Sequence, residues 1–318
     1  MTAYVIRRVL WVIPVLWAVA TITFLLMHAV PGGPFTQDKS LPPAVNEALE
    51  RRYHFDEPLW QQYGHYLINL TKGDLGLSVS NNQEVSEVVR RTFFVTAQLG
   101  LLSLLVAVIV GMTLGTVAAL NHNGPFDYIG VGFATIGASV PNFILGAFIS
   151  IVFAVQLGWF KLQGWGGPLE WGDVFDTGAY HWDKVVLPVV ALSALPASYI
   201  ARVTRASVLE VLNQDYIRTA RAKGLRETTV VLRHTIKNAL IPVLTVVGPL
   251  AAALVTGSFI IERMFSIPGL GLETIRAVLA RDYNTIMGTT LVFTLVISIA
   301  NLLVDLAYAA VDPRIRYR

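Results

Sequence analysis

The sequence contains no cysteine and carries little charge. The absence of cysteine among its 318 residues excludes disulfides, iron–sulfur clusters and cysteine-ligated zinc. Charged residues make up 14% of the chain, whereas a typical soluble domain has about 25%. The dipeptide Gly-Lys does not occur, so there is no Walker A phosphate-binding loop, and no His-Glu-x-x-His zinc motif is present. We therefore expect no catalytic residues, no metal site and no cofactor in this chain.

The sequence contains several long runs of uncharged, mostly apolar residues. Hydrophobic residues form 54% of the sequence, and an apolar run of about 18 residues or more predicts a transmembrane helix. The first run exceeds the 7–15 apolar residues of a secretory signal, which favours an uncleaved anchor. We expect an all-α membrane protein with six transmembrane helices. The expected crossings are Val9–Val30, Phe93–Leu120, Tyr128–Leu157, the stretch between Lys184 and Arg202, Ala239–Ile261, and Ile286–Ala310.

The short loops predict the orientation in the membrane. Arg7 and Arg8 precede the first crossing, residues 202–237 hold eight basic against three acidic residues, and the last seven residues hold three arginines. With six crossings these regions share one side, and basic loops lie in the cytoplasm. We expect a multi-pass protein of the plasma (inner) membrane with both termini cytoplasmic. The net charge of +3 is explained by these loops, without nucleic-acid binding.

The sequence divides into four expected parts. Residues 1–30 form the N-terminal segment and first crossing, 31–92 an extracytoplasmic cap, 93–310 the transmembrane core, and 311–318 a cytoplasmic tail. Four-residue spacing predicts two short amphipathic helices in the cap. The apolar positions are Val45, Leu49 and Tyr53 in the first helix, and Trp60, Tyr63 and Leu67 in the second, which starts after Pro58.

The expected crossings contain few ionisable residues. His28 and Asp305 lie near the ends of the first and last crossings, where we expect interfacial or locally paired side chains. An ion-coupled transporter usually needs a buried carboxylate or broken helices at mid-membrane, so an outside energy source is favoured. The pair Gly111–Gly115, and more weakly Gly132–Ile136, predicts close helix packing.

Residues 209–237 form a charged stretch between two apolar runs. Leu209, Leu212, Tyr216 and Ala220 follow helical spacing, Gly224 suits a helix stop, and a second helix from Glu227 carries Val231, Leu232 and Ile236. We expect a helix–turn–helix in the cytosol, with Ala220 and Gly224 forming a shallow patch for close docking. The alternative is an ordinary basic loop whose charges are solvated, and on physical grounds the two are equally supported.

Several motifs resemble the dipeptide/oligopeptide permease family of ABC importers, specifically the "B" member of its permease pair. They are "YVIRRVLWVIPVL", "TFLLMHAVPGGPF", "GDLGLS", "DYIRTARAKGL…RHTIKNALIPV", "IERMFSIPGLGLETIRAVLARDYNTIMG" and "DLAYAAVDPRIRYR". The resemblance implies a type I ABC importer (MetI-like) permease fold. It further implies that the 209–237 loop couples to an ATPase subunit through Asp215, Tyr216, Arg218, Thr219, Ala220, Arg221, Lys223, Gly224 and Leu225. The general importer pattern has a glutamate where this chain has Arg218, so that contact has no counterpart here.

The resemblance also implies partners. They are a homologous second permease, two ATP-binding subunits that hold ATP and Mg²⁺, an extracytoplasmic solute-binding protein, and membrane lipid. The cap and the segment Glu262–Gly271 are expected to face the binding protein. In that segment Phe265, Ile267, Pro268 and Gly269 are the expected contact residues, with Phe265, Ile267 and Leu270 as exposed apolar groups. The alternative is that these side chains pack on the bundle.

The expected function is ATP-driven import of short peptides. Relatives with the same architecture handle nickel, glutathione or other small solutes, so another solute is the first alternative. An ion-coupled secondary transporter and a membrane scaffold are the other two. No residue in the sequence identifies the solute.

Overall fold

The computed structural model describes residues 2–31, 51, 55–169, 180–256 and 259–311. The first expected cap helix, at Val45 to Tyr53, lies outside these residues. The helices are α1 (Thr2–Ala29), α3 (Leu59–Thr71), α4 (Val85–Leu120), α5 (Pro125–Ser139), α6 (Asn142–Ile149), α7 (Trp182–Leu212), α8 (Asp215–Ala222), α9 (Glu227–Thr229), α10 (Lys237–Val255), α11 (Phe259–Met264), α12 (Leu270–Leu279) and α13 (Tyr283–Val311), with two π-helical segments, η1 (Ser150–Gln156) and η4 (Val230–Ile236). In the described ranges the sole β feature is an isolated bridge between Leu77 and Glu84.

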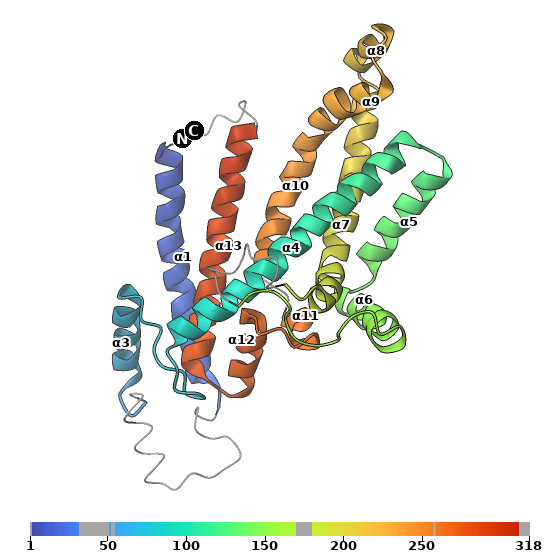
Figure 1. The fold of residues 1–318 in the computed structure, drawn as a ribbon. Coiled ribbons are helices and arrows are strands. Elements are labelled where there is room, and N and C mark those ends of the chain that lie inside the picture. Colours follow the sequence, from blue (N-terminus) through green and yellow to red (C-terminus); the bar gives the residue numbers. More distant parts are fainter. Residues whose placement is uncertain (1, 32–50, 52–54, 170–179, 257–258, 312–318) are drawn as a thin grey trace.

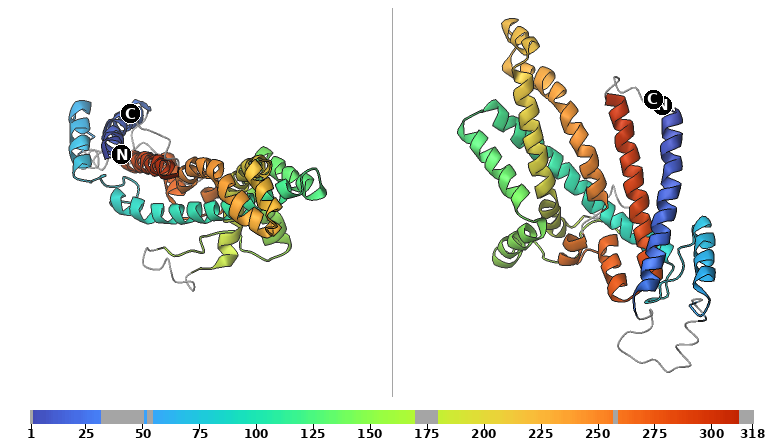
Figure 2. Two further views of the ribbon diagram at one scale, coloured as in Figure 1. Left: turned by 90° about the horizontal axis from the view of Figure 1, so that it is seen from above. Right: turned by 180° about the vertical axis from the view of Figure 1, so that it is seen from behind.

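The long helices run between two distinct ends of the molecule. Helix α8 projects beyond the bundle at one end, where α1 begins and α13 ends (Figure 1). Helices α6, α11 and α12 lie at the opposite end, and α3 lies beside the last turns of α1 (Figures 1 and 2). We call these the α8 end and the α12 end. The described parts of the segments that the sequence marked for a partner therefore lie at one end or the other.

Five described helices are long and apolar enough to cross a membrane, and there are six candidate crossings if a bent pair of helices counts as one span. The five are Ile6–Ala29, Val85–Leu120, Trp182–Leu212, Glu227–Val255 and Tyr283–Leu306; the pair is Pro125–Ser139 with Asn142–Gln156. The expected number of passes agrees with this arrangement. An all-α membrane fold is confirmed.

The third expected crossing, Tyr128–Leu157, is broken into two helices at Pro141. The chain bends by 107° between α5 and the α6–η1 segment. Val140 is extended (ψ 121°), a conformation favoured for a residue that precedes proline, and Pro141 has no N–H to continue the helical hydrogen bonds. With 15 residues, α5 spans about 22 Å at 1.5 Å per residue, less than the roughly 30 Å of a bilayer core.

The fourth and fifth passes differ from the expected boundaries. Helix α7 has 31 residues and contains Pro188 and Pro196, so it runs well beyond the expected 17-residue stretch. The fifth pass ends at Val255, and Ile261 belongs to the separate helix α11. Charge alone misplaced the limits of α7, because a helix continues through basic residues once it reaches the interface, and it placed the end of the fifth pass too late.

Glycines allow α4, α5 and α7 to pack at backbone distance. A Cβ on Gly111 would lie 2.7 Å from the carbonyl oxygen of Ala197, and a Cβ on Gly115 would overlap that of Ala201. Gly111 and Gly115 thus mediate the expected close packing. On α5, Gly130 faces α4 and Gly137 faces α7. The expected role of Gly132 is wrong, because open space surrounds it.

Candidate functional site

The α8–η4 hairpin comprises α8, the turn Lys223–Arg226, α9 and η4. Gly224 has φ +75°, the left-handed conformation that ends a helix most easily with glycine, and its N–H bonds to the carbonyl of Arg221 at 2.9 Å. The Arg221 guanidinium donates two hydrogen bonds to Glu227, at 3.1 and 2.6 Å. The hairpin is therefore a preformed projection, as the sequence predicted.

The hairpin has a small apolar core of its own. Ile217, Ala220 and Val230 are buried together, and Asn238 donates to the Tyr216 hydroxyl at 3.0 Å. The predicted docking patch at Ala220 is wrong, because Ala220 faces this core and only 6% of it is exposed. The predicted apolar face of the second helix is also wrong: Val230 and Thr235 are buried, whereas Leu232 is 65% exposed.

The exposed surface of the hairpin includes both charged and apolar groups. Of the expected coupling residues, Asp215, Tyr216, Arg218, Thr219, Arg221, Lys223, Gly224 and Leu225 are exposed. Leu225 is an apolar side chain at the tip, with 41% exposure. No atom lies within 4 Å of a Cβ built on Gly224, so the chain itself leaves this site uncovered.

An ion pair joins α5 to α7 near the hairpin, and no spacing in the sequence predicted it. The Arg205 guanidinium donates to both oxygens of Asp127, at 2.6 Å from Nε and 2.7 Å from Nη2. The backbone N–H of Asn123 donates to the same carboxylate at 2.9 Å, and His122 lies 3.3 Å from it. Asp127 is 4% exposed. We call this arrangement the Asp127–Arg205 clamp.

At the α12 end, Glu262 connects three elements. Thr96 of α4 donates to Glu262 Oε1 at 2.9 Å, the N–H of Leu272 donates to Oε2 at 3.0 Å, and the N–H of Leu270 donates to Thr96 at 2.8 Å. Glu262 is fully buried. Its carboxylate caps the N-terminus of α12, where negative charge is favoured, and holds α11 against α4.

The apolar side chains of this segment are not exposed, so that expectation is wrong. Phe265, Ile267 and Leu270 have 1% exposure or less. Phe265 and Ile267 belong to the main core, together with residues of α4 and α7, so packing on the bundle explains them. Ser266 and Pro268 are exposed beside them. Gly269 is buried because the Thr96 hydroxyl and the Glu262 carboxylate occupy the space of a Cβ.

The buried carboxyl of Glu262 is expected to make the free energy of unfolding depend on pH. Burial raises the pKa of Glu262 to about 7, so the folded state holds a proton that the unfolded state releases near pH 4.5. The resulting stabilisation is complete below about pH 4.5 and is lost as the pH rises through 7, with a limit of about 3 kcal/mol. Melting temperatures should fall between pH 5 and pH 8, and less steeply in Glu262→Gln. Parallel slopes in the two proteins would contradict this prediction.

Asp282 fixes the loop before α4 to the start of α13. Its carboxylate accepts hydrogen bonds from the hydroxyls of Ser78, Ser80 and Thr285, and from backbone N–H groups of the same region. Asn284 adds a bond to the carbonyl of Leu77 at 2.8 Å. The motif "GDLGLS" is thus a structural junction of the cap.

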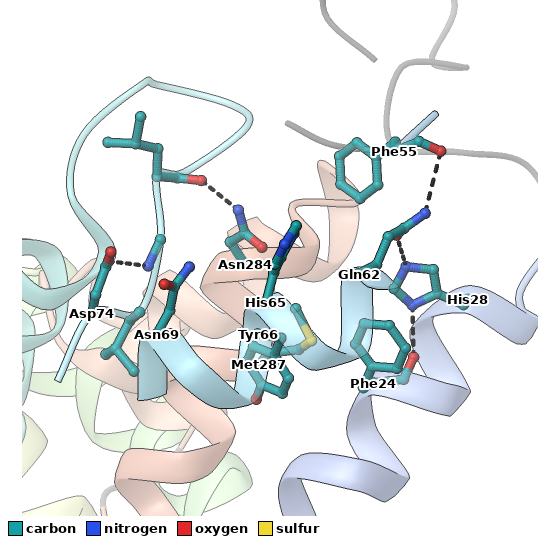
Figure 3. Close-up of a pocket in the computed structure, with 13 residues that line it drawn as sticks. Phe24, His28, Phe55, Gln62, His65, Tyr66, Asn69, Asp74, Asn284 and Met287 are labelled. Atoms are coloured by element: carbon teal, nitrogen blue, oxygen red, sulfur yellow. Dashed lines mark hydrogen bonds between the residues drawn. The ribbon is translucent and has the colours of Figure 1, made fainter. Parts of the chain in front are cut away.

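A cavity of about 180 Å³ lies between α1, α3 and α13 (Figure 3). His28 bonds to Gln62 at 3.0 Å and to the carbonyl of Phe24 at 2.8 Å, which confirms that His28 is locally paired. The expected α3 helix is present, but its packing face is partly wrong: Tyr63 and Tyr66 pack on α1, and Trp60 is 72% exposed.

Comparison with known protein families shows which family this chain belongs to. Residues 111–317 match the family described as binding-protein-dependent transport system inner membrane component, and residues 1–100 match the corresponding N-terminal family. The chain belongs to this permease family. The membership was expected from the motifs quoted above and is confirmed.

Named relatives of this permease share its full length. The oligopeptide transport system permease protein OppB of Haemophilus influenzae is 38% identical over 318 residues, covering 100% of both chains. The dipeptide transport system permease protein DppB of Bacillus subtilis is 41% identical, covering 99% of this chain and 98% of that one. OppB of Escherichia coli K12 is 39% identical over the full length of both. All three are permease proteins and not enzymes.

A solved structure shares the permease fold. The inward-facing MetNI methionine ABC transporter matches 71% of this chain and 96% of its own, with a TM-score of 0.56 and 18% identity. The expected ABC importer permease fold is therefore confirmed.

Proposed function

We propose that this permease subunit translocates short peptides in an ATP-driven importer. The observation that carries the proposal is full-length relatedness to OppB and DppB proteins at 38–41% identity. The two ends of the molecule support it. At the α8 end, the Arg221–Glu227 ion pair holds the hairpin together. At the α12 end, hydrogen bonds to Asp282 and Asn284 hold the cap to α13. Nickel or glutathione as the solute is the alternative, with an ion-coupled transporter the more distant one.

The complex would contain four kinds of component. Two ATP-binding subunits supply ATP hydrolysis, since this chain has no Walker A motif. A homologous permease completes the membrane part. A solute-binding protein meets the α12 end, where Ser266 and Pro268 are exposed and replace the buried Phe265 as the contact proposed within that segment. The α8–η4 hairpin takes the ATP-binding subunit through Leu225 and its basic neighbours.

We place the α8 end in the cytoplasm, following the basic loops. A cysteine introduced at Arg226, on the exposed hairpin turn, is expected to react with impermeant maleimide only from the cytoplasmic side. A cysteine at Arg276, 62% exposed on α12, is expected to react only from outside. The native chain has no cysteine, so background labelling is absent. Labelling of both sites from one side would disprove this topology.

Affinity purification of the tagged chain from its native membrane tests the assembly. The expected co-purifying proteins are a second permease and an ATP-binding subunit, and an associated binding protein would carry peptide. Recovery without any nucleotide-binding subunit would overturn the proposal. Recovery of the complex with a metal-loaded binding protein would favour the nickel alternative.

A further inference from the structure

The Asp127–Arg205 clamp connects the hairpin to the broken pass. Arg205 lies on α7, which continues to Leu212 and is followed after two residues by α8. Asp127 lies in the first turn of α5, and α5 ends at the 107° bend. One ion pair thus joins the element that carries the hairpin to the element that leads into α6 at the α12 end.

Packing around the clamp makes α4, α5 and α7 one unit. Gly115 lets α4 lie against Ala201 and the backbone nitrogen of Arg205, and Gly130 lets α5 lie against Ala118 of α4. These contacts bring the three helices to backbone distance. The Asp127–Arg205 pair adds a directional link between α5 and α7, because a bidentate guanidinium–carboxylate contact is geometrically specific.

We propose that Asp127 and Arg205 are positioning residues for transport: the clamp makes α5 move together with α7 when an ATP-binding subunit displaces the hairpin. The movement reaches α6 through the bend at Val140–Pro141. This inference rests on the proposed function. The Arg205 side chain is 26% exposed, and ion pairs that keep contact with solvent contribute little to stability, so a purely stabilising role explains the clamp less well.

The chain offers a matched control pair. Arg8 of α1 and Asp305 of α13 form an ion pair of the same residue types at 2.8 Å, also between helices and at the α8 end (Figure 1). It joins helices that do not carry the hairpin. Asp305→Asn therefore removes an Arg–Asp pair between helices, with more exposed side chains (47% and 21%), without uncoupling α5 from α7.

The test uses the complete complex in proteoliposomes. The readouts are ATP hydrolysis, peptide uptake, and their ratio. Asp127→Asn and Arg205→Gln are each expected to lower peptide imported per ATP at least fivefold while ATP hydrolysis stays within twofold. The double variant is expected to be no worse than either single one, because the two residues act as a pair. Asp305→Asn is expected to keep the wild-type ratio.

A distance measurement provides an independent readout. Spin labels at Tyr128→Cys on α5 and Thr228→Cys on the hairpin, both exposed positions, report whether α5 follows the hairpin. Their separation is expected to be unchanged by ATP when the clamp is intact and to change by several ångström with Asp127→Asn. If Asp127→Asn reduces recovery of the complex, Arg205→Lys retains the charge but loses the bidentate geometry and takes its place.

The outcomes separate this inference from the proposed function. Wild-type complex without ATP-dependent uptake would refute the proposed function. Normal uptake per ATP in the clamp variants of a working complex would overturn the clamp alone. A proportional fall of hydrolysis and uptake, with an unchanged ratio, would show a structural role only and would also overturn it. A change on ATP addition in the distance between the two spin labels, in the protein with an intact clamp, would also overturn the clamp proposal.

Discussion

Replacing Gly115 by leucine is expected to lower the yield of folded protein strongly. A Cβ at this position would overlap the carbonyl oxygen of Ala201 and lie 2.7 Å from Cβ of Thr204. Both α4 and α7 would have to separate, because backbone atoms cannot move aside as a flexible side chain does. The cost is about 3 kcal/mol or more, roughly a hundredfold in the folding equilibrium. Yield of monodisperse protein after detergent extraction measures the effect.

Gly132→Leu is the matched control. Gly132 also lies within a membrane helix, but no atom approaches within 4 Å of its Cβ position. The substitution therefore adds apolar side chain to open space and is expected to leave the yield near wild type. Equal losses in the two variants would mean that glycine itself, rather than close packing, is required at both sites.

Gly224→Trp is expected to abolish transport without unfolding the membrane helices. The residue lies at the exposed tip of the hairpin with φ +75° and with no atom within 4 Å of its Cβ position, so an indole is accommodated within the chain. It would project from the surface proposed to meet the ATP-binding subunit. Peptide uptake should fall at least tenfold, and co-purification of that subunit should fall with it.

Gly224→Ala separates bulk from backbone strain. Any side chain in a left-handed conformation costs roughly 1–2 kcal/mol, but a methyl group adds little volume. Alanine is expected to retain most of the uptake that tryptophan removes. Equal defects would assign the effect to the turn, and wild-type uptake with Gly224→Trp would contradict the proposed docking of the hairpin.

The sequence predicted elements whose signal is local. Apolar run length indicated the passes through the membrane, and Gly224 between two amphipathic stretches indicated the hairpin. Orientation of faces was less predictable: spacing placed Tyr216 with Ala220, whereas Ile217 and Ala220 share the buried face. The short break after Asn213 changed the helical register, which a single continuous pattern does not capture.

Interactions between residues far apart in the chain could not be predicted from the sequence. Asp127 and Arg205 are 78 residues apart, and Thr96 and Glu262 are 166 apart, so no spacing connects them. Phe265 and Ile267 appeared exposed because a loop between membrane passes is usually at the surface. They are buried because α11 and α12 fold this loop back onto α4 and α7. Such burial depends on tertiary contacts and produces no periodic apolar pattern in the sequence.

Uptake of a labelled short peptide into proteoliposomes tests the central claim most directly. The complex purified through this chain is reconstituted with its binding protein, with ATP supplied on the side of the hairpin. The account predicts accumulation that requires ATP, the ATP-binding subunits and the peptide-loaded binding protein. Uptake driven by an ion gradient in the absence of ATP and of any ATP-binding subunit would contradict it.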